Sequence, residues 1–156
     1  MQAANSVRES SFDRLTLSRA TLYEAIFTKS EIRYPISEIG AALDDLRCSG
    51  RKQYLPLGLL TRAWLRSLRG DAAGARADLD EAWDIAERGP MRLHMADIHL
   101  HRARLFFREN PYPWESPEAD LAAAEKLIKD CGYHRRDREL ADAKRATLPV
   151  TVRISR

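Results

Sequence analysis

Apolar and small residues recur along most of this chain at the spacing of an amphipathic helix. The clearest case is DAAGARADLDEAWDIAERG, residues 71–89. Its apolar positions follow i, i+4, i+7 and i+11 and form one stripe, made of Ala75, Leu79, Ala82 and Ala86. Asp71 is a favourable N-cap before this stripe, and Gly89 is a favourable residue just after it. The pattern predicts a helix over 72–88.

The same reasoning predicts six further helices, near 9–29, 36–48, 55–69, 91–109, 116–131 and 137–147. Each of four prolines stands where a first helical turn tolerates it: Pro35, Pro56, Pro90 and Pro117. The longest irregular stretch is ENPYPWESPE, residues 109–118. The final LPVTVRISR alternates like a strand but has no strand partner, so we expect a loose tail or pairing with another chain's edge. We therefore expect an all-α fold.

An internal repeat runs through these helices. RATL at 19–22, RAWL at 62–65 and RARL at 102–105 are 43 and 40 residues apart, and RATL returns at 145–148. Leu79 and Ala82 correspond to Leu121 and Ala124 at an offset of 42. Periods of this size with two helices per unit are typical of an α-solenoid. We expect a right-handed array of about three antiparallel helical hairpins, closed by a C-terminal capping helix, as one domain over 1–148 with a basic flexible tail at 149–156.

The turn and small-residue positions decide between solenoid types. Residues 54–88 resemble a tetratricopeptide repeat position for position, at Ala63, Gly70-Asp71, Ala75, Leu79 and Ala82. Small residues at these positions let two helices approach closely. Arg62 and Arg66 depart from that pattern, because the family prefers large apolar residues there. The offset of about 40 also exceeds the tetratricopeptide period of about 34, which indicates lengthened loops.

A wider resemblance covers residues 54–140. The run from YLPLGLLTRAWL to RARLFF, followed by GYHRRDREL, is similar to the C-terminal repeat segments of large bacterial signalling ATPases of the STAND/NACHT kind. The resemblance implies a sensor or scaffold role, with the chemistry in another domain. No GxxxxGK[ST] loop occurs in this chain, so the nucleotide-binding domain of those proteins is absent from it.

Composition restricts the class of protein to which this chain can belong. Apolar residues make up 44% and charged residues 31%, which is ordinary for a folded globular chain of 156 residues. No apolar run is long enough for a transmembrane helix, and MQAANSVRESSFDR lacks the layout of a signal peptide. Cys48 and Cys131 have no CxxC spacing, which suits a reducing bacterial cytosol; a disulfide between them is the less favoured alternative. We expect a cytoplasmic protein.

The net charge of +3 is modest but uneven. The end of the chain, KRATLPVTVRISR, has four basic residues and no acidic one. Such a segment could contact nucleic acid or an acidic partner. A nucleic-acid-binding helical protein that uses the basic C-terminal third is therefore the main alternative function.

The common catalytic motifs are missing. There is no GxSxG, no HExxH and no Gly-rich dinucleotide loop. On the helix 91–109, one polar stripe contains His94, Asp97, His101, Arg104 and Arg108. Two histidines and a carboxylate suit zinc or iron, but His94 and His101 are two turns apart, about 10 Å, which is too far for one ion. We expect a solvated or peptide-binding face without a metal, and we expect His99, on the opposite side, to be a satisfied core histidine.

The repeated arginines Arg19, Arg62 and Arg102 admit two interpretations. They could line a groove for an acidic peptide or phosphate, or they could pair with carboxylates such as Asp78 or Glu81 between helices. The second is favoured, because a charge on a half-buried face needs a partner.

Partner binding is the function that the pattern favours. Aromatic and apolar residues on the first helix of a repeat act as anchors when they face a groove. The predicted contact residues are Leu57, Trp64, Leu68, Asp97, His101, Arg104 and Arg108. We expect a non-enzymatic protein–protein interaction module without a cofactor, for a peptide or protein partner; its exposed end faces also favour a homodimer.

GYHRRDREL, residues 132–140, gathers chemistry-bearing side chains but is predicted to be a corner between two helices. Gly132 should end the helix before it, with Tyr133 folding back on its last turn. Asp137 should cap the next helix, with Glu139 in its first turn and Leu140 starting its buried stripe. The exposed residues of this corner should then be His134, Arg135 and Arg136. Contact between its arginines and a partner is the less favoured interpretation.

Overall fold

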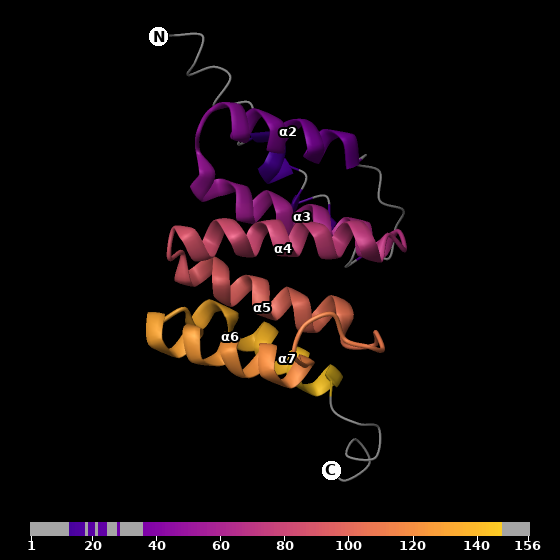
Figure 1. Ribbon diagram of the computed structural model, residues 1–156, viewed down its shortest axis with the longest axis vertical. Coiled ribbons are helices and arrows are strands. Elements are labelled where there is room, and N and C mark those ends of the chain that lie inside the picture. Colours follow the sequence, from indigo (N-terminus) through magenta and orange to yellow (C-terminus); the bar gives the residue numbers. More distant parts are fainter. Residues whose placement is uncertain (1–12, 18, 21, 25–27, 29–35, 148–156) are drawn as a thin grey trace. The chain divides into compact units, whose positions relative to one another are not determined.

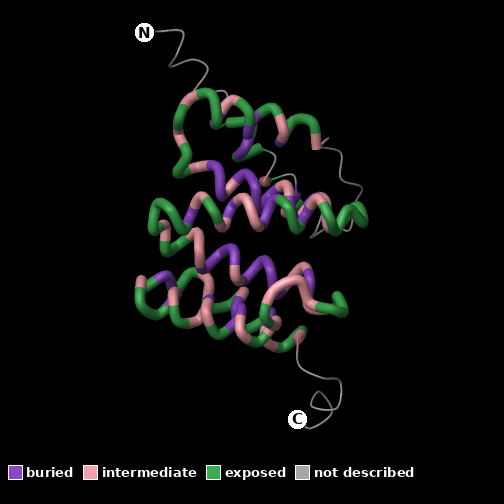
Figure 2. Tube along the Cα trace, viewed as in Figure 1, coloured by how far each residue is buried: buried purple, intermediate pink, exposed green. Residues whose placement is uncertain are grey.

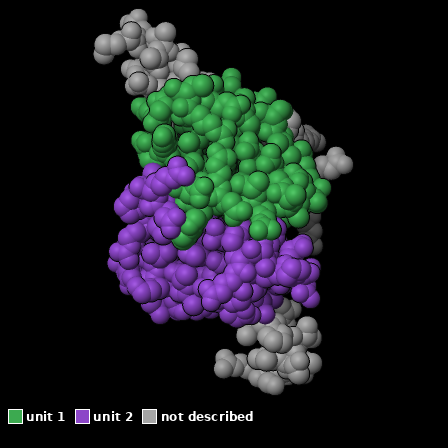
Figure 3. Space-filling model, in the orientation of Figure 1, with its two compact units in different colours: residues 1–85 green, residues 86–156 purple. Residues whose placement is uncertain are grey.

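The computed structural model describes residues 13–17, 19–20, 22–24, 28 and 36–147, and the described residues form helices and turns with no strand among them (Figure 1). The predicted all-α class is confirmed. The chain divides into two compact units, residues 1–85 and 86–156, which Figure 3 shows in two colours. Each unit is described by itself, and the single repeat domain over 1–148 stays a prediction. The tail at 149–156 lies outside the described residues.

Unit 1 contains α2 (Ile36–Cys48), the 3₁₀ turn η1 (Lys52–Tyr54), α3 (Leu55–Leu68) and most of α4 (Ala72–Arg88), which continues into unit 2. The described residues between 13 and 28 are helical; the rest of the predicted helix 9–29 lies outside the described part. α2 packs against α3, and Gly58 permits the approach. A Cβ added there would lie 2.7 Å from Cδ2 of the buried Leu43.

Unit 2 contains α5 (Arg92–Phe106), α6 (Pro117–Cys131), the 3₁₀ turn η2 (His134–Arg136) and α7 (Asp137–Thr147). α5 packs against α6, and α7 packs against both. Their shared core contains nine buried residues: Ala96, Leu100, Ala103, Leu121, Ala124, Ile128, Tyr133, Leu140 and Ala143. Figure 2 shows buried, half-buried and exposed positions alternating along the helices. The predicted stripe of α4, Ala75, Leu79, Ala82 and Ala86, is also fully buried.

Local sequence signals set the helix ends. The Asp71 carboxylate accepts a hydrogen bond from the Gly74 N–H at 2.8 Å, and the Ser116 hydroxyl accepts one from the Ala119 N–H at 3.0 Å. Both residues are therefore N-caps. Gly132 has a φ of 63°, and the Tyr133 N–H donates to the Ile128 carbonyl at 2.8 Å. This is a Schellman ending, as predicted for this glycine.

Three details differ from the sequence-based expectation. The helix predicted over 91–109 ends at Phe106, where Glu109 N–H turns back to the Phe106 carbonyl before Pro111. The turns η1 and η2 were not expected. Asp137 has helical angles, φ −57° and ψ −40°, so it is the first residue of α7 rather than its N-cap. No helix in the described part of the chain is both long and apolar enough to cross a membrane.

Candidate functional site

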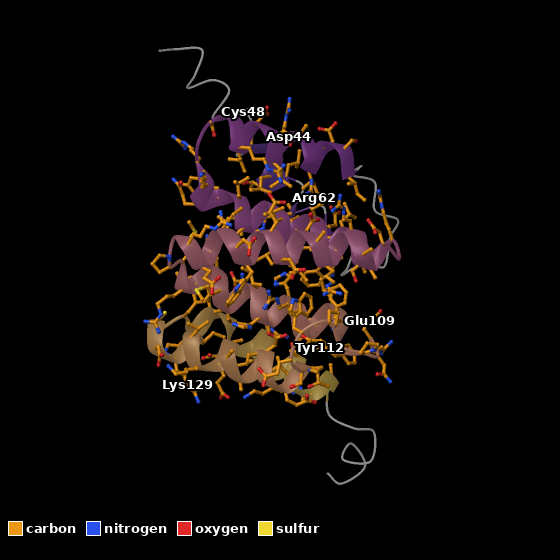
Figure 4. All side chains as sticks on the ribbon, viewed as in Figure 1. Asp44, Cys48, Arg62, Glu109, Tyr112 and Lys129 are labelled. Carbon is orange, nitrogen blue, oxygen red and sulfur yellow. The ribbon has the colours of Figure 1, made fainter. Side chains whose placement is uncertain are left out.

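Among the described residues, three buried carboxylates each lie at the centre of a polar cluster, one in unit 1 and two in unit 2. The first joins α3 to α4. Arg62, labelled in Figure 4, donates from Nε and Nη2 to both carboxylate oxygens of Asp78 at 2.7–3.2 Å. Arg66 lies 2.9 Å from the same carboxylate, of which only 2% is exposed. The interhelix pairing predicted for the repeated arginines is confirmed at Arg62, where a buried carboxylate needs such partners.

The second cluster surrounds Asp120 in α6. Asp120 precedes Leu121 as Asp78 precedes Leu79, so the two carboxylates hold equivalent positions in the repeat. The Asp120 carboxylate, 5% exposed, accepts a hydrogen bond from His99 Nδ1 at 2.6 Å and another from the Tyr112 hydroxyl. Burial raises the pKa of Tyr112 above its ordinary value, and the bond to Asp120 raises it further. His99 is thus hydrogen-bonded, as predicted, but it is partly buried rather than a core residue.

An aromatic group adjoins this second cluster. The ring of Trp114 meets Phe106 edge-on at 5.2 Å and Tyr112 at 5.5 Å between centroids. The guanidinium of Arg102 lies 4.7 Å from the centre of the Trp114 ring. Arg102 is the repeat counterpart of Arg62, and it stacks on an aromatic ring, a contact that guanidinium groups favour.

The third cluster joins α5 to the corner before α7. Asp97, 3% exposed, receives Arg136 Nε at 2.8 Å, Arg136 Nη2 at 3.3 Å and the Tyr133 hydroxyl at 3.2 Å. Arg136 also donates to Glu139 at 2.8 Å. Burial lowers the pKa of Arg136, but the charges of Asp97 and Glu139 outweigh this effect and raise it overall. The guanidinium therefore stays charged and binds η2 to α5.

His101 lies beside this third cluster with 7% of its surface exposed. Its Nδ1 is 2.7 Å from the Asp97 carbonyl oxygen, and a carbonyl only accepts, so Nδ1 carries the proton. Burial lowers the pKa of His101 from 6.5 to about 4, and the charges of Arg104 and Arg136 lower it as well, against the opposing effect of Asp97. The imidazole is neutral at pH 7.

The predicted contact residues fall into both units. In unit 1, Leu57 and Trp64 are half-buried and Leu68 is 51% exposed. The Trp64 ring meets Tyr23 edge-on at 6.1 Å. These three residues share one side of α3, and of the three only Leu68, at its C-terminal end, is exposed.

In unit 2, the structure brings Asp97, His101 and Arg104 together, but against the chain's own corner. The expectation of a solvated stripe is wrong for Asp97 and His101, because Tyr133 and Arg136 cover that part of α5. Arg104 is partly exposed and lies 3.8 Å from Glu139. Arg108 is exposed, with its guanidinium 5.2 Å from the Phe107 ring.

The corner itself also differs from its prediction at one residue. His134 and Arg135 are exposed, as expected, and Arg135 stacks on Tyr133 at 4.8 Å. Arg136 is instead largely buried by its pairing with Asp97. The stretch GYHRRDREL is thus a structural corner with a buried ion pair.

Comparison with known proteins adds no relative. No family model, no curated protein and no solved structure matches the chain significantly. In the part of the chain that the structure describes, no group of three or more His, Cys, Asp or Glu side chains is placed to hold a metal ion. Cys48 and Cys131 are free thiols.

The sequence analysis did not predict the roles of Tyr112, Asp120 and Arg136 in these clusters. The sequence did contain a signal for Asp120. The 42-residue offset that relates Leu79 to Leu121 also relates Asp78 to Asp120. Tyr112 and Arg136 lie outside the regular helices, and their contacts depend on how the loop and the corner fold.

Proposed function

We propose that this chain is a tetratricopeptide-like array, a right-handed solenoid of about three antiparallel hairpins, that acts as a non-enzymatic protein–protein interaction module. The repeated positions support this architecture. Ala63 and Ala103, 40 residues apart, are both fully buried, and so are Ala82 and Ala124, 42 residues apart. Small buried residues at repeated positions are what close packing of successive hairpins needs.

The polarity of α7 supports its role as a capping helix. Leu140 and Ala143 are its buried residues, whereas its exposed positions are mostly charged or small: Asp137, Arg138, Ala141, Asp142, Arg145 and Ala146. A terminal repeat needs such a polar outer face to stay soluble.

The observation that carries the interaction role is the exposed Leu68 on the same side of α3 as Trp64 and Leu57. Leu68 is 51% exposed, whereas Leu57 and Trp64 are half-buried. A large apolar side chain next to an indole is a typical anchor for a partner. Within unit 2, Arg104 and Arg108 are partly and fully exposed cations, which suit acidic residues of a partner. The resemblance to STAND/NACHT-type repeat segments fits a scaffold or sensor role in a bacterial cytosol.

The test is quantitative affinity capture with three forms of the immobilised chain: wild type, Leu68→Glu and Leu93→Glu. Leu93 is the matched control, because it is 45% exposed on α5 and is not a predicted contact residue. We expect a partner that wild type and Leu93→Glu retain equally and that Leu68→Glu loses by tenfold or more. The proposal is contradicted if all three forms capture the same proteins equally. It is also contradicted if the chain binds nucleic acid at micromolar affinity with a steep salt dependence.

A further inference from the structure

The segment 107–116 between α5 and α6, here called the strap, is longer than the link between α3 and α4 in unit 1. α3 and α4 are joined by residues 69–71 alone. From Leu65 to Leu79 there are 14 positions and from Leu105 to Leu121 there are 16, so the corresponding stretch of unit 2 is only two residues longer. The strap is longer chiefly because α5 ends two residues earlier relative to Leu105 than α3 does relative to Leu65, and because α6 begins three residues later relative to Leu121 than α4 does relative to Leu79. Pro111, Pro113 and Pro117 prevent helix through this stretch, since proline lacks the N–H and blocks the preceding turn.

The strap lies on charged side chains that are buried beneath it. Tyr112 donates its hydroxyl to Asp120, and Trp114 covers Arg102. Asp120 and Arg102 are 5% and 7% exposed, whereas Arg108, Glu109, Asn110, Pro111 and Glu115 of the strap are exposed. In Figure 4 Tyr112 is labelled within this segment. Moving the strap would therefore give solvent access to a cation and an anion.

The carboxylate that holds the strap has a second donor that belongs to α5. When Tyr112 leaves, His99 Nδ1, 2.6 Å away, still donates to Asp120. Departure of the strap therefore does not leave a buried carboxylate without a donor, which is the costly outcome in most cores. Segments outside the helices, held by a few side chains, are those that open locally while the rest stays folded.

We propose that the strap is a lid that opens and closes over α5 and α6, with the Tyr112–Asp120 hydrogen bond as its latch. Closed, it buries Arg102 and Asp120. Open, it exposes them as a polar surface of unit 2, with His99 retaining Asp120 in place. This inference concerns unit 2 alone and does not depend on the proposed interaction role.

Site-specific proteolysis of the full chain tests the lid. The protein is incubated with a glutamate-specific protease, for which the exposed Glu109 and Glu115 of the strap are cleavage sites. Mass spectrometry measures the cleavage rate at each site. This rate follows the population of the open form when opening is fast. Removing a hydrogen bond to a charged group should raise that population roughly ten- to a hundredfold. We expect Tyr112→Phe to raise strap cleavage by this factor.

The matched control is Tyr133→Phe, which removes a hydroxyl that also donates to a buried carboxylate, Asp97, but lies outside the strap. It should leave strap cleavage unchanged. In wild type, strap cleavage should hardly depend on urea below the unfolding transition, because a local opening exposes little surface. The proposal is overturned if Tyr112→Phe cleaves at the wild-type rate, or if cleavage within α6 at Glu125 rises equally. A urea dependence equal to that of global unfolding overturns it as well.

Discussion

Asp78 in α4 and Asp120 in α6 hold equivalent repeat positions but bind different partners. Asp78 lies between two guanidinium groups, those of Arg62 and Arg66. Asp120 accepts hydrogen bonds from a phenol and an imidazole. In unit 1 the carboxylate therefore joins one helix to the other by charge, and in unit 2 it also holds a loop. A repeated residue keeps its position and burial while its neighbours change what it does.

The helices α3 and α5 show the same difference. At an offset of 40, Leu57 corresponds to Asp97 and Thr61 to His101. One backbone contact is preserved: Thr61 Oγ1 donates to the Leu57 carbonyl at 2.9 Å, as His101 Nδ1 does to the Asp97 carbonyl at 2.7 Å. The side that is apolar in α3 is polar in α5, where it binds the corner before α7.

The largest effect should come from making α5 resemble α3 at Asp97. Asp97→Leu introduces the residue found at the equivalent position, Leu57, and removes the main partner of the largely buried Arg136. We expect a loss of about 3 kcal/mol in the free energy of unfolding, because breaking a buried pair leaves an uncompensated charge. Urea denaturation followed by circular dichroism measures it.

The double variant Asp97→Leu/Arg136→Met controls for the charge. Replacing both members of a buried pair with apolar residues is often neutral, so most of the lost stability should return. If the double variant is as unstable as Asp97→Leu, the loss does not come from the stranded guanidinium, and this account of the third cluster is wrong.

A smaller, pH-dependent difference should come from His101. The folded-state pKa of His101 is lowered to about 4 from 6.5. Between these two values, His101 is therefore protonated in the unfolded chain and neutral in the folded chain. This contribution is absent above pH 6.5 and lowers the stability as pH falls, by about 1.5 kcal/mol between pH 6.5 and pH 5. His101→Thr, which copies Thr61, should remove that part of the pH dependence. Urea unfolding of both proteins across this range checks it, and parallel curves would contradict it.

The all-α class and most helix positions could be predicted from the sequence because their signals are local. The stripe of α4, the cap at Asp71 and the Schellman ending at Gly132 each depend on residues within one or two turns. The clusters depend on residues far apart, such as Asp97 and Arg136, 39 positions apart. Helical periodicity places Asp97 on a polar stripe, but it does not show whether water or another part of the chain covers that stripe.

The smallest effect should come from the two glycine turns, which are alike in both units. Gly70 and Gly132 have φ values of 80° and 63°, and an added Cβ would meet nothing within 4 Å at either position. The cost of alanine is then the left-handed backbone alone, about 1 kcal/mol at each site. Thermal or urea unfolding of Gly70→Ala and Gly132→Ala should give equal losses. A loss at Gly132 that is larger by 2 kcal/mol or more would show that this corner does more than turn the chain.

Two double-mutant cycles test most directly the claim that Asp78 and Asp120 have diverged in role. One cycle combines Arg62→Met with Asp78→Asn, and the other combines Tyr112→Phe with Asp120→Asn; urea unfolding gives the coupling energy of each pair. We expect about 2–3 kcal/mol for the charged pair of unit 1 and about 1.5 kcal/mol for the neutral donor of unit 2. A coupling between Tyr112 and Asp120 that equals or exceeds the coupling between Arg62 and Asp78 would contradict it.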